Sequence, residues 1–312
     1  MQFPFPISQG REFDVLGFGS NAVDFLISVP EYPRFSSKVE LSKYTRSAGG
    51  EVATTCAGLE RIGFHTSYAG RFGDDDAGKF GIASLRDEGV DLQFSQTIDG
   101  AETQIAFIVI DEKTGERTVI WKRDRQLSFK RDEAPVEGIA RCRVLHMTHH
   151  DTTACIRLAE TARAGGVPVS LDVDNVVDGI EKLLPLVDIL IAGSEFPARL
   201  LNISNPKDAL IEMHSRFGSA VAGITLGEKG SLLYCNGEFI SSGGCDVPGG
   251  CKDTTGAGDA FRVGFLAGLL DGEPVEYAAL MANAVAALKC REVGARTALP
   301  TRDELTAFLR KQ

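Results

Sequence analysis

The sequence predicts an α/β fold in which a doubly wound, mostly parallel sheet is flanked by helices. Short apolar runs rich in Val, Ile and Leu alternate along the chain with segments of helical periodicity. The runs are apolar on both faces, which is typical of parallel strands covered by helices on both sides. The chain repeats this strand–helix order, and its 312 residues are enough to bury a large core without disulfides or metals.

The apolar runs give the order of the expected strands, which lie at 14–19, 66–70, 143–148, 167–173, 188–193 and 220–227. The expected helices lie between or after them, at 51–62, 76–88, 152–164, 196–201, 206–217 and 257–271. No internal repeat or low-complexity tract interrupts the chain. We therefore expect a single domain over residues 1–312.

Two segments depart from the strand–helix order. Residues 24–48 contain strand-like pieces but no helix, and residues 101–123 contain two apolar runs around the turn DEKTGE, which indicates a hairpin. We expect these segments, about 24–48 and 101–123, to pair as a small β-sheet. Such a sheet over the carboxyl edge of the main sheet would act as a lid that excludes water from a site beneath it.

Composition excludes several classes of protein. The net charge of −10 argues against nucleic acid and anionic membrane partners, which need a basic surface. No apolar stretch approaches the roughly 18 residues of a membrane span, and the first residues do not read as a secretory signal. The seven cysteines are odd in number and form no CxxC pair, which favours reduced thiols in a cytoplasmic protein and not a zinc site.

Glycine is in excess, at 34 residues, and its most informative cluster is the segment 253–259, DTTGAGD. The apolar spacing after Asp259 is helical, so the glycines open onto a helix N-terminus, where backbone N–H groups and the helix dipole favour an anion. Asp259 alone could be a helix cap. A cap does not need Gly-x-Gly beside it, whereas a cradle for a transferring phosphoryl group does.

On these residues the sequence resembles the PfkB (ribokinase-like) family of carbohydrate kinases, of which DTTGAGD is the C-terminal signature. The resemblance extends over nearly the whole chain, through Gly49-Gly50 with 59–63, then 69–78, 85–91, 224–234 and 282–295. It implies a ribokinase-like fold and an ATP-dependent kinase that uses Mg²⁺ and acts on a hydroxyl of a sugar-like molecule. It also implies a homodimer that pairs through the lid, whose strands carry the apolar residues Phe25, Ile27, Val29, Phe107 and Val109.

The resemblance assigns Asp259 as the catalytic base, which would take the proton of the attacking hydroxyl in a loose phosphoryl transition state. Gly256, Ala257 and Gly258 would supply the N–H groups of the anion hole. Mg²⁺ would bridge the ATP phosphates.

The nucleotide site is expected at Thr225, Gly227, Gly230, Asn283 and Ser194. The alternative for the segment 225–230 is an ordinary turn into a hairpin, and for Asn283 an exposed helix asparagine.

The residues expected to bind metal ions match the family pattern less closely. The Asn-x-x-Glu motif of the family is absent after the strand 188–193, and Glu195, shifted by one position, is left to organise Mg²⁺ through water. Many family members also bind a monovalent cation through backbone carbonyls, and Asp253 and Gly294 occupy those positions here. Potassium is therefore a candidate ligand.

On the acceptor side, Asp24 matches the family's substrate-binding aspartate, whose carboxylate accepts hydrogen bonds from two hydroxyls. Gly49 and Gly50 would let the backbone approach the sugar. Thr54 stands where many sugar kinases have Asn, so ribose specificity cannot be carried over. Arg123 either lies on a solvated strand edge or reaches a substrate carboxylate or phosphate.

Other interpretations remain open. The acceptor could be a ketose, an acid sugar, a sugar phosphate or a nucleoside, with a nucleoside kinase as the main alternative in this fold. The segment 17–22 fits the dinucleotide fingerprint GxGxxA, with Glu40 about 20 residues on, and would indicate an NAD-dependent dehydrogenase if it opened a helix. A third class is a non-catalytic sugar- or nucleotide-binding protein, which the intact Asp259 and glycine turn disfavour. The adjacent His149 and His150 are expected to point apart, as on a strand.

Overall fold

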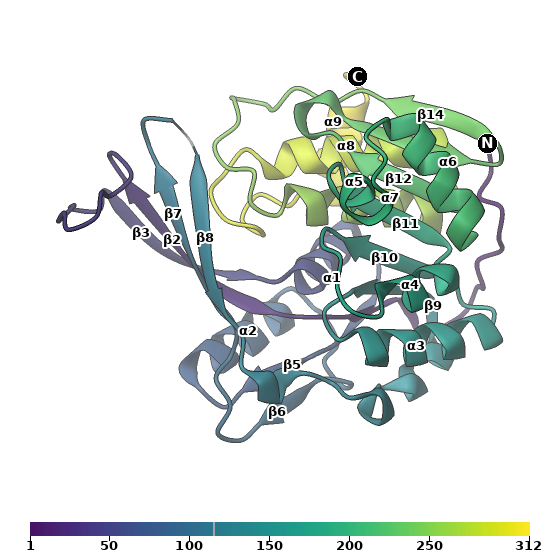
Figure 1. Ribbon diagram of the computed structural model, residues 1–312, viewed down its shortest axis with the longest axis horizontal. Coiled ribbons are helices and arrows are strands. Elements are labelled where there is room, and N and C mark those ends of the chain that lie inside the picture. The colour runs from purple at the N-terminus through teal and green to yellow at the C-terminus, as the bar shows by residue number, and fades with distance from the viewer. Residues whose placement is uncertain (115) are drawn as a thin grey trace.

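The centre of the molecule is an eight-stranded sheet with the order β14-β13-β12-β11-β10-β9-β1-β4 (Figure 1). The computed structural model describes residues 1–114 and 116–312. The strands are β1 (Phe13–Phe18), β4 (Thr66–Ala69), β9 (Cys142–Thr148), β10 (Val169–Val173), β11 (Ile189–Gly193), β12 (Val221–Thr225), β13 (Ser231–Cys235) and β14 (Glu238–Ser242). All neighbours from β4 to β12 pair in parallel, and β13 is antiparallel to both of its neighbours. The predicted fold class is confirmed.

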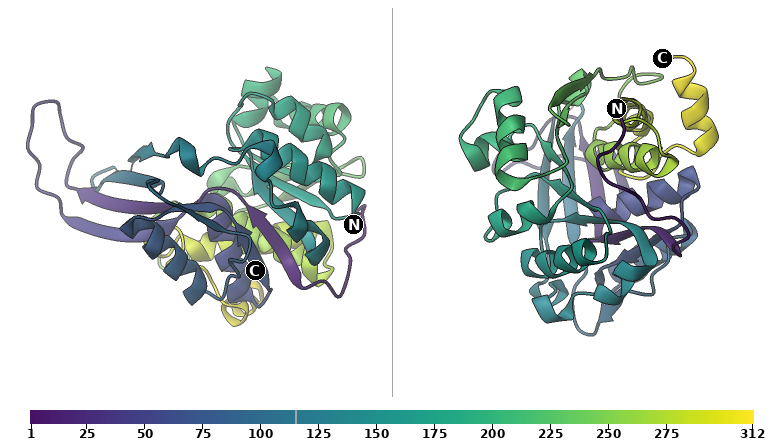
Figure 2. Two further views of the ribbon diagram at one scale, coloured as in Figure 1. Left: turned by 90° about the horizontal axis from the view of Figure 1, so that it is seen from below. Right: turned by 90° about the vertical axis from the view of Figure 1, so that its right-hand side faces the viewer.

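Helices cover both faces of this sheet (Figure 2). One face packs against α3 (Thr152–Ala164), α4 (Ile180–Leu183), α5 (Phe196–Leu201) and α6 (Pro206–Phe217). The other packs against α1 (Glu51–Ile62), α7 (Ala257–Asp271), α8 (Val275–Lys289) and α9 (Arg302–Leu309). Each face of the sheet has its own hydrophobic core. Successive side chains of a strand point to opposite faces, so Val144 belongs to one core and its neighbour Leu145 to the other. This alternation explains why the runs are apolar on both faces.

A separate four-stranded sheet projects from the α/β body, with the order β3-β2-β7-β8 (Figures 1 and 2). Its strands, which we call the lid, are β2 (Ala22–Val29), β3 (Lys43–Gly49), β7 (Ile105–Asp111) and β8 (Arg117–Lys122). The hairpin β7–β8 forms as the sequence predicts, and its turn includes Gly115, which lies outside the described residues. The central pair of the lid, β2 and β7, is parallel.

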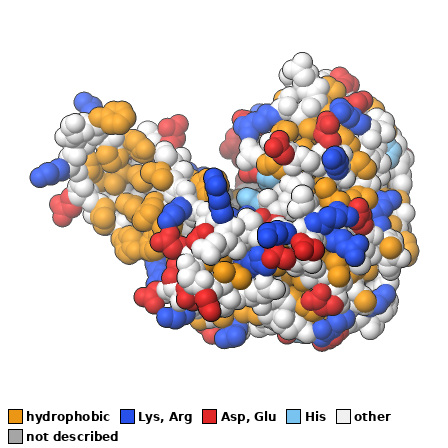
Figure 3. Space-filling view, turned by 60° about the horizontal axis from the view of Figure 1, so that its bottom comes forward, with side chains coloured by type: hydrophobic (Ala, Val, Ile, Leu, Met, Phe, Trp, Pro, Cys, Tyr) orange, Lys and Arg blue, Asp and Glu red, His pale blue; other side chains and the backbone are white. Residues whose placement is uncertain are grey.

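The two faces of the lid differ. The inner face carries Asp24 and also Leu26 and Ile108, which are buried and pack with Val293 of the body. The outer face carries Phe25, which stacks on Phe107 and Tyr44. In the space-filling view, hydrophobic side chains gather on the projecting sheet, and the molecule is hollowed between this sheet and the body (Figure 3).

Several elements were not predicted or differ from the expectation. The strands β5 (Arg71–Gly73) and β6 (Gln96–Ile98) form a two-stranded sheet that was not predicted, and α2 (Asp76–Asp87), the helix predicted at 76–88, packs on β5. Helix α9 was also missed. Short 3₁₀ turns lie at Arg125–Leu127, Arg131–Glu133, Val136–Arg141, Leu184–Leu186 and Gly227–Lys229.

The segment 17–22 leads from β1 directly into the strand β2. A dinucleotide fingerprint has to open a helix, so this segment does not form one. Within residues 1–114 and 116–312, no helix has both the length and the apolar character needed to cross a membrane.

Candidate active site

The glycine turn before α7 has the geometry of an anion hole. Gly256 is the N-cap of α7 and has φ 76°, in the left-handed region. A Cβ at this position would lie 2.9 Å from the Cβ of Ala295, so the turn also needs glycine for space. The N–H of Ala257 already donates to the carbonyl of Thr254 at 3.1 Å. Within the described residues the N–H groups of Gly256 and Gly258 have no such partner, which leaves them to face an anion.

Asp259 lies in the first turn of α7, beside these N–H groups. Burial raises the pKa of its carboxyl to about 7, and the negative charge of Asp172 acts in the same direction. Arg262 lowers this pKa, and Asp24 of the lid raises it. The carboxyl group is therefore close to both the acceptor-side aspartate and the interior of the sheet, and it titrates near neutral pH.

Arg262 holds the anion-hole turn from the side of the core, and it was not predicted as a site residue. It is almost fully buried, and it donates to the carbonyl of Gly258 at 3.0 Å and to the carbonyl of Ile191 at 2.8 Å. Its guanidinium also pairs with Asp172 on β10 at 2.6 Å. The available signal was a single arginine inside the otherwise apolar helix segment AFRVGFLAGLL.

The acceptor-side residues come together at the base of the lid. Asp24 is buried, and burial raises its pKa to about 6, against the opposing charge of Arg296. Gly49 lies directly against the Asp24 carboxylate, and a Cβ there would overlap it. Gly50 follows as the N-cap of α1, with φ 89°.

Arg296 packs against these residues from the interior, and it too was not predicted as a site residue. It is buried, and it donates to the carbonyl of Gly49 at 2.5 Å and to the hydroxyl of Thr54 at 3.2 Å. Thr54 thus anchors an arginine, whose position directly after the Gly294-Ala295 pair was the only sequence signal. The loop after α8 and the start of α1 are joined at this point.

Asp253 links the anion-hole turn to the loop at Gly294. Its carboxylate accepts the N–H of Thr255 and the N–H of Gly294, both at 2.8 Å. Burial raises the pKa of Asp253, but the hydrogen bond from Gly294 and the charge of Lys289 outweigh burial and hold the pKa below its usual value. The ionised carboxylate of Asp253 therefore holds the anion-hole turn and the loop at Gly294 together.

Most of the predicted nucleotide residues line one cavity of about 840 Å³. Its wall includes residues from β12, from the turn after it, from α8 and from the anion hole: Thr225, Gly227, Gly230, Asn283, Ala257 and Gly258. Asn283 is not an exposed helix residue, because it is buried and its amide donates to Ser242 Oγ at 2.9 Å. The cavity opens onto the N–H groups of the turn at Gly258.

Ser194 and Glu195 do not join this wall. Neither lines the cavity, and the Glu195 side chain is 74% exposed and paired with Arg199 on α5. The structure therefore does not place Glu195 where it would organise a metal ion.

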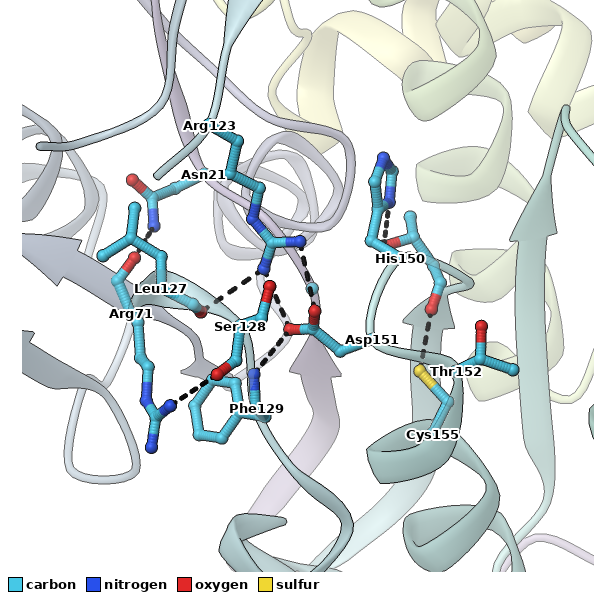
Figure 4. Close-up of polar contacts among 12 residues, drawn as sticks. Asn21, Arg71, Arg123, Leu127, Ser128, Phe129, His150, Asp151, Thr152 and Cys155 are labelled. Atoms are coloured by element: carbon cyan, nitrogen blue, oxygen red, sulfur yellow. Dashed lines mark hydrogen bonds and ion pairs between the residues drawn. The ribbon is translucent and has the colours of Figure 1, made fainter. Parts of the chain in front are cut away.

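Arg123 does not lie on a solvated edge. Its guanidinium makes two hydrogen bonds to Asp151, at 2.9 and 3.1 Å, and a third to the carbonyl of Leu127 (Figure 4). This bidentate pair joins the end of β8 to the start of α3.

His149 and His150 precede Asp151 and, against the expectation, stack on each other with ring centroids 4.8 Å apart. The chain has left the strand β9 before them, so strand alternation does not apply.

Comparison with known proteins shows which family and fold the chain resembles. The family model of the pfkB family carbohydrate kinases matches residues 14–302. An ATP-dependent ribose-1-phosphate kinase of Halopiger xanaduensis is 29% identical over 95% of this chain and 97% of that protein. A nucleoside kinase of Methanothermobacter thermautotrophicus is 26% identical over 93% and 94%.

Among solved structures, Arabidopsis thaliana ribokinase in complex with ribose and ATP superposes with a TM-score of 0.84 at 24% identity, over 96% of this chain and 99% of that one. At that identity the likeness shows the fold. The family match covers almost the whole chain and includes both the glycine turn and the lid. The chain therefore belongs to the pfkB family of carbohydrate kinases.

Proposed function

We propose that this protein transfers the γ-phosphoryl group of ATP to a hydroxyl of a sugar or sugar-like small molecule. The observation that carries the proposal is the position of Asp259. It stands beside the free N–H groups of the turn, whose Gly258 lines the nucleotide cavity, and within the field of Asp24 on the acceptor side. A hydroxyl held between Asp24 and Asp259 would meet the γ-phosphorus at the mouth of the cavity.

In this proposal each residue has a separate task. Asp259 accepts the proton of the attacking hydroxyl late in a loose transition state. The N–H groups of Gly256 and Gly258 stabilise the charge that develops on the transferred group. Arg262 holds the turn in place, because it bonds the carbonyl of Gly258 from within the core.

Magnesium would enter with the nucleotide. The described part of the chain holds no group of three or more ligating side chains arranged around a metal position. Mg²⁺ supplies charge neutralisation on the ATP phosphates, which an acidic protein cannot provide through its net charge.

The acceptor would be bound from the lid. Asp24 offers two carboxylate oxygens to vicinal hydroxyls, and Gly49 lies against that carboxylate without a side chain of its own. A nucleoside is the second candidate, because Trp121 is 61% exposed and lies in the same row of the lid as Asp24, with Ala106 between them. An exposed indole on that face could stack on a planar base.

The outer face of the lid supports the proposal of a homodimer. Phe25, Phe107 and Ile120 share this face, and Ile120 is 56% exposed. An apolar patch on a thin projecting sheet marks an interaction surface, and a second lid of the same chain has the complementary shape. A cytoplasmic location is supported by the seven cysteines, all of which are unpaired.

The test is an ADP-release assay on a panel of ketoses, acid sugars, sugar phosphates and nucleosides, with and without Mg²⁺. We expect turnover with at least one acceptor and none without Mg²⁺. Asp259→Asn should lower kcat by about 10²–10⁴-fold, while ATP binding, measured by calorimetry, persists. Full turnover in this variant would refute the assignment of the base. Stabilisation by NAD⁺ and not by ATP in thermal unfolding would refute the kinase.

A further inference from the structure

Lys289, the last residue of α8, carries a fully buried ammonium group. Its side chain has no exposed surface, and Nζ donates to the carbonyl oxygen of Asp253 at 2.8 Å. The Asp253 carboxylate lies 3.8 Å away. Burying an ammonium group is costly, and a lysine is seldom found in such a place without a specific task.

The ammonium group lies beneath the anion hole. Asp253 is the residue through which the turn 253–258 and the loop at Gly294 are joined, and Lys289 binds its main chain and lies near its carboxylate. Asp259 is among the charges that act on Lys289, so the positive field of the lysine reaches the candidate base.

This arrangement does not fit a potassium ion. A monovalent cation held by backbone carbonyls would need the carbonyl oxygen of Asp253, and the positively charged ammonium group of Lys289 already donates to that oxygen. Two cations on one carbonyl would repel each other. A protonated amine and K⁺ resemble each other in charge and in their preference for carbonyl oxygens, so one can serve where the other would.

We infer that the Lys289 ammonium is a built-in cation that supports the anion hole, so that phosphoryl transfer needs no added potassium. Lys289 does not touch the reacting atoms. It is a positioning residue that fixes the main chain of Asp253 and adds positive charge behind the turn where negative charge develops. The inference rests on the proposed function.

The first experiment uses the unmodified protein. Turnover and thermal unfolding are measured in choline chloride and in KCl at equal ionic strength. We expect the initial rate to change by less than about twofold and the unfolding temperature to be the same in both salts. An enzyme that is nearly inactive in choline and is activated by K⁺ would overturn the inference while leaving the proposed kinase intact.

The second experiment removes the ammonium group in Lys289→Ala. We expect kcat in choline to fall by about 10²-fold, with little change in KM for ATP, because the lost charge acts on the transition state. Ammonium, ethylammonium or K⁺ ions should then restore at least about a tenth of the rate. The variant should also gain a rise in unfolding temperature in KCl that the unmodified protein lacks.

Lys252→Ala is the matched control. Lys252 precedes Asp253, its side chain is half exposed and it pairs with Glu292, so the variant makes the same charge change near the same turn. It should respond to neither salt. Full activity of Lys289→Ala in choline, full activity of Lys289→Met, whose side chain fills the same space without a charge, or a loss in Lys289→Ala that no cation restores would each show that the lysine only packs.

The unfolding measurements do not depend on turnover. If no acceptor is phosphorylated, the proposed function fails, and the presence or absence of a new potassium response in Lys289→Ala still decides the inference. If Lys289→Ala does not fold in choline, KCl should recover its folding, and failure to do so would count against the inference.

Discussion

Asp259 combines a proposed catalytic role with a cost in stability. Burial raises the pKa of this carboxyl from its usual value to about 7, so the folded state binds the proton more tightly than the unfolded state does. The stabilisation from the bound proton is fully present below the unfolded pKa, about 3.9. It is lost as the pH rises towards 7. At alkaline pH the folded protein holds a charge that it would be more stable without.

Replacing the charge should therefore stabilise the protein at high pH only. We expect Asp259→Asn to unfold a few degrees above the unmodified protein at pH 8.5, and the difference to shrink or vanish at pH 5. Thermal unfolding of both proteins at the two pH values tests this, and the comparison cancels the titration of groups that do not interact with Asp259. A difference that grows towards pH 5 would contradict the raised pKa.

The same pKa sets the pH dependence of the reaction. The base has to be ionised, so the activity should be half of its maximum near pH 7, level off at more alkaline pH, and fall on the acid side by about tenfold per pH unit. The measurement is kcat against pH at saturating Mg-ATP and acceptor. An acid limb that begins only below pH 5 would show that the carboxyl is not held near neutrality.

Individual site residues were predictable where a motif fixes the backbone and not where burial alone defines them. Gly49 lies against Asp24, and the charge of Asp24 reaches Asp259; Gly49 and Asp259 sit at glycine turns, and Asp24 lies near the start of β2. Arg262 and Arg296 escaped the prediction, because an arginine within an apolar segment, or one beside a glycine pair, does not show in a single sequence which groups it binds. Their partners, such as the carbonyls of Ile191 and Gly49, carry no side-chain signature.

Helix α7 shows how an element is placed by its two ends. The structure begins it at Ala257 and ends it at Asp271, as predicted, because a left-handed glycine stands on each side: Gly256 with φ 76° and Gly272 with φ 77°.

The lid strands were predicted as strands, but not their order. The parallel pairing of β2 with β7 depends on contacts between distant segments, which local patterns do not contain.

These two glycines allow a controlled test of the turn. Alanine at Gly272 meets open space and should cost only the backbone penalty, about 1 kcal/mol. Alanine at Gly256 adds a clash with Ala295 and should cost about 2–3 kcal/mol and most of the activity. Urea unfolding of both variants measures the difference. Equal losses would mean that the turn at Gly256 can move away from Ala295.

At the scale of the whole molecule, the chain is acidic although its proposed ligand, ATP, is an anion, and positively charged groups at the site offset this repulsion. A net charge of −10 opposes the binding of ATP. Under the proposed function, positive charge at the phosphate site would come from the free N–H groups of the turn, from the buried Arg262 and Lys289, and from the metal carried by the nucleotide. Composition argued against nucleic acid as a partner but could not indicate this local positive charge.

Adjacent residues of β8 test the assembly. Ile120 lies on the outer face of the lid and Val119 on the inner face, and both are about half exposed. Ile120→Lys should convert a dimer to a monomer, whereas Val119→Lys should leave the dimer intact. Light scattering after size-exclusion chromatography reads the mass directly. A monomeric unmodified protein, or a dimer that survives Ile120→Lys, would refute pairing through this face.

The parallel centre of the lid also has a consequence for how the chain folds. Val23 lies beside Ile105, and the chain between them contributes α1, β4 and α2 to the body. Bringing such distant segments together costs loop-closure entropy, which is lower once the intervening chain is compact. We therefore expect the body to form first and the lid last, so that a newly made chain assembles its phosphate-binding turn before it can enclose an acceptor.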